Sequence, residues 1–142
     1  MIRWPVSFGE AADRLSILQI KRERIRDPRK LANVEMELVE AEPLLLEHVR
    51  QTTEFESLFA RLKEINRRLW DIEENIRQHE RAGDFGPEFV VLARSVYTSN
   101  DERYRVKREI DRLMGSVIPE EKSYSDVECS ERLAHCADPA QD

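Results

Sequence analysis

The sequence predicts an all-α protein, an antiparallel up-down helical bundle of about four helices followed by a disordered acidic C-terminal tail. The 142 residues are 40% hydrophobic and 37% charged, with only four glycines, which is typical of helices with one apolar and one charged face. The apolar residues recur at alternating steps of three and four, which is helical spacing. The connections between these stretches are short, which favours antiparallel neighbours. We therefore expect a helical domain over residues 1–118 and a tail over residues 119–142.

The first helix is expected to run from Phe8 to Arg26. Ser7 followed by Glu10 is the pattern of a capping box, in which each residue bonds a free backbone N–H of the first turn. The pair Asp27-Pro28 ends the helix, because proline disfavours helical geometry in the residue before it. Apolar side chains surround most of this helix, as expected for the central helix of a domain.

The second helix begins at Pro28, with Asp27 as its cap. One face carries apolar residues at steps of three and four, namely Leu31, Val34, Leu38, Ala41 and Leu45. Pro43 lies inside this pattern, so we expect either a kink or a restart near Glu42.

The third helix has the most regular pattern in the chain. Thr53 and Glu56 are expected to form its capping box, and Gly83 is the natural residue to end it. Its apolar stripe spans three heptads, with Phe55, Leu58, Leu62, Ile65, Leu69, Ile72 and Ile76. Leu69 lies midway and should be fully enclosed, although such a stripe could also form the seam of a dimer.

The fourth helix begins at Pro87, and its apolar stripe is interrupted. Phe89, Leu92, Ala93 and Val96 open the stripe, Ser99, Asn100 and Arg103 break it, and Ile110, Leu113 and Val117 resume it before Gly115 and Pro119. Either the helix breaks near Ser99, or it continues with polar groups in its seam.

Two cations of the first helix, Arg14 and Lys21, project from its apolar side, seven residues apart. An unpaired buried cation costs several kcal/mol. Each must therefore reach solvent along its aliphatic stem, form an internal ion pair, or hold an anion. We favour the first of these alternatives.

A second polar group lies where the third and fourth helices should face each other. Asn100, Arg103 and Lys107 follow the interrupted stripe, and Asn66 and Glu73 lie beside the apolar seam of the third helix. Glu73 is the carboxylate that we expect to pair with these cations. We favour a buried network that fixes helix register over a basic pocket for a carboxylate or phosphate. In the pocket alternative, the ligand-binding residues are Arg14, Lys21, Asn66, Glu73, Asn100, Arg103 and Lys107.

Charge and composition argue against several classes of function. Seven acids and two bases lie after Ile118, so the tail carries −5 of the net charge of −6 and the helical domain carries −1. A near-neutral domain lacks the basic face that nucleic acids require. No apolar run approaches the roughly 20 residues of a membrane span.

No metal or cofactor site is expected. The histidines share no ligand spacing, and the only two cysteines, Cys129 and Cys136, lie in the tail, which suggests free thiols and a cytoplasmic protein. All four glycines fit turns or helix ends, so none is left to cradle a phosphate. No catalytic motif is present.

Three segments together resemble a known family, namely PVSFGEAADRLSILQIKRERI, LKEINRRLWDIEENIR and ARSVYTSNDERYRVKREIDRLMGS with EEKSY after it. The resemblance covers roughly residues 5–124 and is to a small bacterial family of unknown function, associated with genes for lipopolysaccharide and other surface polysaccharides. It implies no particular reaction. The positions that match the family's recognisable polar residues are Asp13, Lys21, Trp70, Glu73, Asn100, Asp101, Arg103 and Lys107.

Two functions remain open at this point. The first is a non-enzymatic module that binds a protein partner, or forms a homodimer, in surface-polysaccharide metabolism. The second is a bundle that binds a small anion through its Arg and Lys cluster, either as a binding protein or as an enzyme. The convergence of Arg14, Lys21, Arg103 and Lys107 on one cavity would distinguish them.

Overall fold

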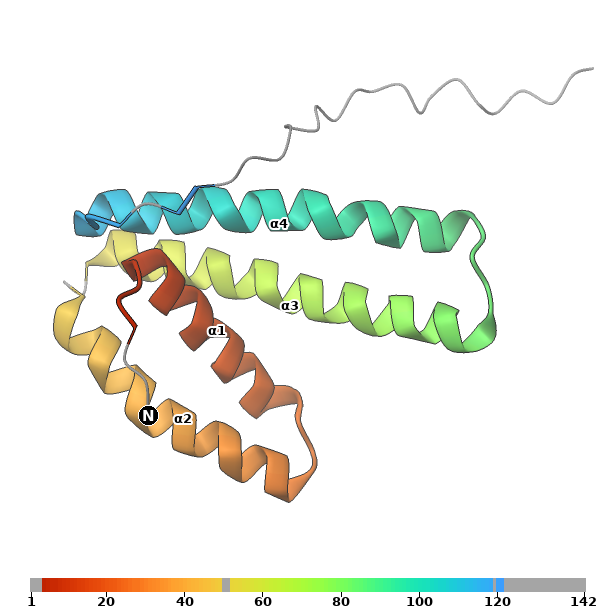
Figure 1. The fold of residues 1–142 in the computed structure, drawn as a ribbon, viewed down its shortest axis with the longest axis horizontal. Helices are drawn as coiled ribbons and strands as arrows, with labels where there is room; N and C mark the ends of the chain where they lie inside the picture. Colours follow the sequence, from red (N-terminus) through yellow and green to blue (C-terminus); the bar gives the residue numbers. More distant parts are fainter. Residues whose placement is uncertain (1–3, 50–51, 119, 122–142) are drawn as a thin grey trace, which may run out of the picture.

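The computed structural model describes residues 4–49, 52–118 and 120–121. These residues form four α-helices and no strand, with α1 at Phe8–Arg24, α2 at Pro28–His48, α3 at Thr53–Ala82 and α4 at Pro87–Met114. Consecutive helices run in opposite directions (Figure 1). The predicted all-α antiparallel bundle is confirmed. The acidic tail that was expected to be disordered lies outside the described residues from residue 122 onward.

The ends of the helices follow local side-chain chemistry. Ser7 Oγ accepts the Glu10 N–H at 3.2 Å, and Asp27 Oδ1 accepts the N–H groups of Arg29 and Lys30. Gly83 ends α3 in the left-handed conformation, with φ of 65°, which glycine adopts without steric cost.

Two predicted boundaries require correction. Helix α1 ends at Arg24 and not at Arg26, because Ile25 already has extended backbone angles while its N–H still bonds the Lys21 carbonyl. The cap of α3 is Thr52 and not Thr53, since Thr52 Oγ1 accepts the Phe55 N–H at 3.2 Å. The capping box expected at Thr53 and Glu56 is therefore wrong by one residue.

Both interrupted patterns turn out to be continuous helices. Helix α2 contains Pro43 without restarting, and α4 runs through Ser99 without a break. Ser99 is buried, so α4 carries polar groups in its seam. This arrangement was one of the two alternatives that the sequence allowed.

Helix α1 lies at the centre of the arrangement. It packs against α2, α3 and α4, whereas the backbone of α2 approaches only α1. In Figure 1, α1 lies between α2 and the long α3–α4 pair. The central position predicted for the first helix is confirmed.

The core forms where α1 meets the α3–α4 pair, and α2 closes its other side. Its buried members include four residues of the apolar stripe of α3 and residues of every other helix, namely Ala12, Leu15, Leu18, Val34, Leu38, Leu45, Val49, Phe55, Leu62, Ile65, Leu69, Val106 and Ile110. Leu69 is 8% exposed, as expected of an enclosed residue. Most of the α3 stripe thus packs inside this chain, whereas Ile76 at its far end is half-buried.

The α3–α4 pair extends well beyond α1 (Figure 1). Between Glu73 and Thr98 no side chain is buried. At the end of the pair, Phe89 makes edge contacts with His79 and Phe85. We call residues 73–98 the distal hairpin.

Among the described residues, no helix combines the length and apolar character that a membrane crossing requires. The predicted cytoplasmic location stays a prediction.

Candidate functional site

The N-terminal turn of α1 lies directly against the last turns of α4. The Gly9 N–H donates to Asp111 Oδ1 at 2.7 Å, so a carboxylate occupies the electropositive end of the helix. A methyl group at Gly9 would lie 2.9 Å from the carbonyl carbon of Lys107 and 3.1 Å from Asp111 Oδ1. Glycine therefore permits a contact between the two helices that any side chain would prevent.

One turn further along this contact, Lys107 binds two carboxylates. Its Nζ lies 2.6 Å from Glu10 Oε2 and 2.6 Å from Glu120 Oε2, and its side chain is only 6% exposed. Burial lowers the pKa of Lys107, but the hydrogen bonds and charges of Glu10 and Glu120 together outweigh burial and raise that pKa above its ordinary value. We call Glu10, Lys107 and Glu120 the Lys107 cluster.

The Lys107 cluster changes the roles of two residues. The carboxylate of Glu10 binds Lys107, so only the Ser7 half of the predicted capping box is seen. The start of the expected tail lies on α4, because the Glu120 carbonyl accepts hydrogen bonds from the Tyr104 hydroxyl at 3.2 Å and from Arg108 Nη1 at 2.9 Å.

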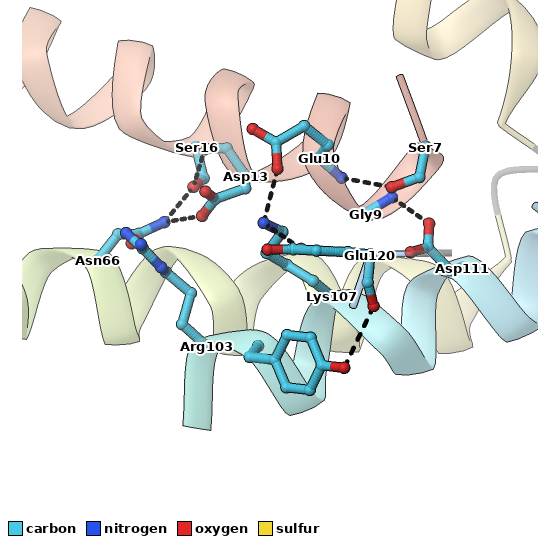
Figure 2. A network of polar contacts seen from close by, with 11 residues as sticks. Ser7, Gly9, Glu10, Asp13, Ser16, Asn66, Arg103, Lys107, Asp111 and Glu120 are labelled. Carbon is cyan, nitrogen blue, oxygen red and sulfur yellow. Dashed lines mark hydrogen bonds and ion pairs between the residues drawn. The ribbon is translucent and has the colours of Figure 1, made fainter. Parts of the chain in front are cut away.

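A second polar group lies beside this cluster and joins α1, α3 and α4 (Figure 2). Asn66 Nδ2 donates to Asp13 Oδ1 and to Ser16 Oγ, both at 2.8 Å, and Ser16 Oγ donates to the Asp13 carbonyl at 2.8 Å. Arg103 Nη1 donates to Asn66 Oδ1 at 3.5 Å. Asp13, Ser16 and Asn66 are buried. We call Asp13, Ser16, Asn66 and Arg103 the Asn66 network.

The Asn66 network opens onto a cleft of about 510 Å³ between α1, α3 and α4. We call it the Arg103 cleft. Its walls combine an apolar part with amides and charged groups, formed by Ile17, Asn66, Leu69, Trp70, Glu73, Glu74, Arg77, Asn100 and Arg103. This mixture of a few polar groups with an apolar wall is typical of small-molecule sites.

The structure brings some of the seven predicted ligand residues together and leaves others apart. Asn66, Glu73, Asn100 and Arg103 line the Arg103 cleft. Lys107 lies one turn from Arg103 but binds Glu10 and Glu120.

The two cations of α1 are not among the residues that line the cleft. Arg14 pairs with Glu37 of α2 at 3.0 Å, and its side chain is 71% exposed. Lys21 is half-buried. The four cations Arg14, Lys21, Arg103 and Lys107 therefore do not converge on one cavity.

The expected role of Glu73 is wrong. Glu73 pairs with Arg77 at 3.6 Å, and its side chain is 50% exposed, while Arg103 bonds Asn66. Seven residues separate Asn66 from Glu73, which places the carboxylate about 10 Å further along α3. Because α4 runs antiparallel to α3, the step from Arg103 to Lys107 leads away from Glu73.

Reasoning from residue patterns missed two parts of this site. Trp70, which only the family resemblance singled out, lines the cleft. The available signal was helical spacing, since Asn66, Trp70, Glu73 and Arg77 follow one another at steps of four, three and four and therefore share one face of the helix. The buried polar partners on α1, Asp13 and Ser16, had no such periodic signal, because Asn66 is more than 50 positions away from Asp13. Asp13 was singled out only by the family resemblance.

The described residues contain no group of three or more His, Cys, Asp or Glu side chains that could hold a metal ion. The lining of the Arg103 cleft supplies guanidinium, amide and carboxylate groups. Such groups can bind and orient an anionic molecule.

Comparison with protein-family models matches residues 2–132 of the chain to DUF6165, a family of unknown function. A search of curated proteins and a search of solved structures each found no significant match.

Proposed function

We propose that this chain, which belongs to the DUF6165 family of unknown function, binds a small anionic molecule in the Arg103 cleft. Arg103 supplies the positive charge in this proposal. Asn66 holds its guanidinium, and Trp70, Leu69 and Ile17 contact the rest of the molecule.

The state of Arg103 carries this proposal. It is half-buried, and among the described residues its hydrogen-bond partner is a neutral amide oxygen, Asn66 Oδ1, with no carboxylate within ion-pair distance. Two other half-buried cations are neutralised, since Lys63 pairs with Glu23 at 2.9 Å and Arg108 with Glu121 at 3.4 Å. Half-buried Lys21 also has no carboxylate of the described residues within ion-pair distance, but it does not line the cleft. Arg103 meets the carboxylate of its network, Asp13, only through the Asn66 amide. A partly desolvated cation without a direct ion pair favours an anion at its side.

The dimensions of the cleft support a small ligand. Its volume of about 510 Å³ falls within the range of roughly 300–1,000 Å³ that is typical of small-molecule sites. The end of the cleft at Asn66 and Arg103 belongs to the polar network that holds α1, α3 and α4 together, so this end is formed before a ligand arrives. A preformed site avoids the ordering cost of binding.

Thermal unfolding in the presence of carboxylates and phosphate esters tests this function. A ligand present at about ten times its Kd stabilises the folded protein by roughly 1.4 kcal/mol, which corresponds to a few degrees in Tm. We expect at least one anion to raise the Tm of the wild type, and Arg103→Met to abolish that increase. Arg105→Met is the matched control, because Arg105 lies on the same helix but is exposed.

Two results would contradict the proposal. One is the absence of stabilisation by any anion of the panel. The other is equal stabilisation of wild type, Arg103→Met and Arg105→Met, which would place the anion outside the Arg103 cleft.

A protein-interaction role is the second candidate, and exposed apolar side chains favour it. Met36 and Val39 of α2 are 64% and 72% exposed, and Phe85 and Val91 of the distal hairpin are 54% and 64% exposed. In this alternative the partner is a protein or a second copy, in the surface-polysaccharide metabolism that the resemblance implies. Sedimentation equilibrium of the wild type and of Val91→Glu tests self-association, which the substitution should weaken.

A further inference from the structure

We infer, on the basis of the anion-binding function proposed above, that the Arg103 cleft selects a monoanionic carboxylate carried on an apolar body and discriminates against phosphate. Three features of the cleft point to this ligand class. They are the charge balance of its walls, the fixed orientation of the Asn66 amide, and the apolar surface formed by Ile17, Leu69 and Trp70.

The charge balance limits the ligand to one negative charge. The walls carry two cations, Arg77 and Arg103, and two carboxylates, Glu73 and Glu74. Arg77 is already paired with Glu73 at 3.6 Å, so Arg103 is the cation of the cleft wall that remains for a ligand. A phosphate monoester carries about −1.5 to −2 charges at neutral pH, more than one guanidinium neutralises.

The Asn66 amide has a fixed orientation that disfavours phosphate. An asparagine amide has two N–H donors, and Asn66 uses both on Asp13 Oδ1 and Ser16 Oγ. Reversing the amide would place its oxygen against the Asp13 carboxylate, so the network defines the orientation. Next to Arg103, Asn66 therefore presents only an acceptor and has no N–H left to bond the additional oxygens of a phosphate.

The remaining donors of Arg103 suit a planar carboxylate. A guanidinium carries five N–H donors, and one of them is held by Asn66 Oδ1 at 3.5 Å. The others can form the paired hydrogen bonds that match the two oxygens of a carboxylate. Asn66, itself held by Asp13 and Ser16, is a positioning residue for Arg103.

The apolar wall defines the body of the ligand. Ile17, Leu69 and Trp70 contribute aliphatic and aromatic surface to the cleft, and such surface favours a hydrocarbon ring or chain. Together, the wall and Arg103 fit an amphipathic acid with its carboxylate at the Arg103 end.

Trp70 provides a direct readout of binding. The chain contains two tryptophans, and Trp4 is 80% exposed and outside the cleft. Trp4→Phe therefore leaves Trp70 as the single tryptophan emitter. This variant is titrated with cyclohexanecarboxylate, cyclohexyl phosphate and cyclohexanol, which share one apolar body and differ in the charged group.

We expect cyclohexanecarboxylate to change the Trp70 emission with a Kd at least tenfold lower than that of cyclohexyl phosphate. Adding Arg103→Met should raise the Kd of the carboxylate at least tenfold and leave that of cyclohexanol unchanged. Adding Arg105→Met should change neither.

The role of the Asn66 amide is tested separately through the carboxylate-to-phosphate affinity ratio. Ser16→Ala removes one of the two acceptors that hold the Asn66 amide in its orientation. An amide free to turn can offer an N–H toward the cleft, which should lower this ratio severalfold without changing the Kd of cyclohexanol. If Ser16 had only a structural role, Ser16→Ala would instead raise the Kd of all three molecules by the same factor. Asn66→Ala should also lower the carboxylate-to-phosphate affinity ratio. If Asn66→Ala does not fold, Ser16→Ala alone still tests the role of the amide.

The outcomes separate this ligand assignment from the proposed function. Equal or tighter binding of cyclohexyl phosphate, lost in Arg103→Met, would overturn the carboxylate preference and leave anion binding intact. If neither anion binds more tightly than cyclohexanol, and Arg103→Met has no effect, both the carboxylate preference and the anion-binding function are wrong.

Discussion

At the scale of single residues, Lys107 is a nearly buried cation that forms two ion pairs. Its ammonium group is almost fully shielded and lies 2.6 Å from one carboxylate of α1 and one carboxylate that follows α4. One ammonium group of α4 therefore holds together α4, the start of α1 and the residues that follow α4. The sequence placed Lys107 among possible ligand contacts, but its donors are already engaged by Glu10 and Glu120.

Replacing Lys107 with methionine should destabilise the fold by roughly 1–3 kcal/mol, because two carboxylates lose their shared partner. Both carboxylates are partly exposed and can turn toward water, which limits the loss. Urea unfolding at neutral pH measures the effect, with the exposed Arg105→Met as a control expected to change stability by less than about 0.5 kcal/mol.

The same comparison has a defined pH dependence. The folded pKa of Lys107 is raised, because the hydrogen bonds and charges of Glu10 and Glu120 outweigh the opposing effect of burial. Its contribution is therefore complete below the ordinary lysine value of 10.5 and is lost as pH rises through the folded pKa. The stability difference between wild type and Lys107→Met should shrink above pH 10.5; a constant difference would contradict the ionic origin.

Glu73 provides the opposite case. Since it is half exposed and paired with Arg77 on the same helix, Glu73→Ala should cost less than about 1 kcal/mol. Chemical denaturation of this variant at low and moderate salt measures the cost. A loss of 3 kcal/mol or more, roughly the cost of breaking a buried ion pair, would show that Glu73 compensates a buried cation after all.

At the scale of helices, the sequence predicts well which helices exist and in which order they follow one another. Two helix starts are capped by side chains, since Ser7 and Asp27 accept N–H groups at most three residues away, and α3 ends where Gly83 adopts a left-handed backbone. A short window of sequence therefore contains the signal for each of these ends. Thr52 and Thr53 show the limit, because adjacent threonines offer the same cap and only tertiary packing chooses between them.

The candidate site was predictable only in part. Asn66, Glu73, Asn100 and Arg103 were found because they interrupt or border apolar stripes. The contact between Asn66 and Asp13 was not predicted, because the two residues are 53 positions apart and helical periodicity does not specify which turns of two helices meet. The rotation and register of packed helices decide such pairs.

The apolar stripe of α3 gives a prediction at this scale. Leu69→Ala should cost roughly 2–5 kcal/mol, because it leaves a cavity in the interface with α1 and α4. Met36→Ala on α2, where the side chain is 64% exposed, should cost far less. Equal losses for the two variants in urea unfolding would contradict the position of the core described above.

At the scale of the whole molecule, stability should be unevenly distributed. The core and both polar groups lie where α1 crosses α3 and α4, while the distal hairpin contains no buried side chain. Regions with few buried contacts open locally at low free-energy cost.

Native-state hydrogen exchange should therefore show a gradient along α3 and α4. We expect backbone amides of the distal hairpin to exchange at least tenfold faster than those around Ile65 and Val106, which are almost completely buried. Uniform protection along both helices would show that the distal hairpin is stabilised by contacts absent from this chain, such as those of a second copy.

The contact between Gly9 and Asp111 has a consequence for synthesis on the ribosome. These residues are 102 positions apart, and Glu10 and Lys107 are 97 apart, whereas α1 and α2 are neighbours that can associate as soon as both have emerged. Asp13 can already bond Asn66 once α3 has emerged, but Gly9 and Glu10 lack their partners until α4 follows. A nascent chain that stalls before Asp111 thus exposes the side of its central helix that α4 covers, and such incompletely folded chains are the ones that aggregate or engage chaperones.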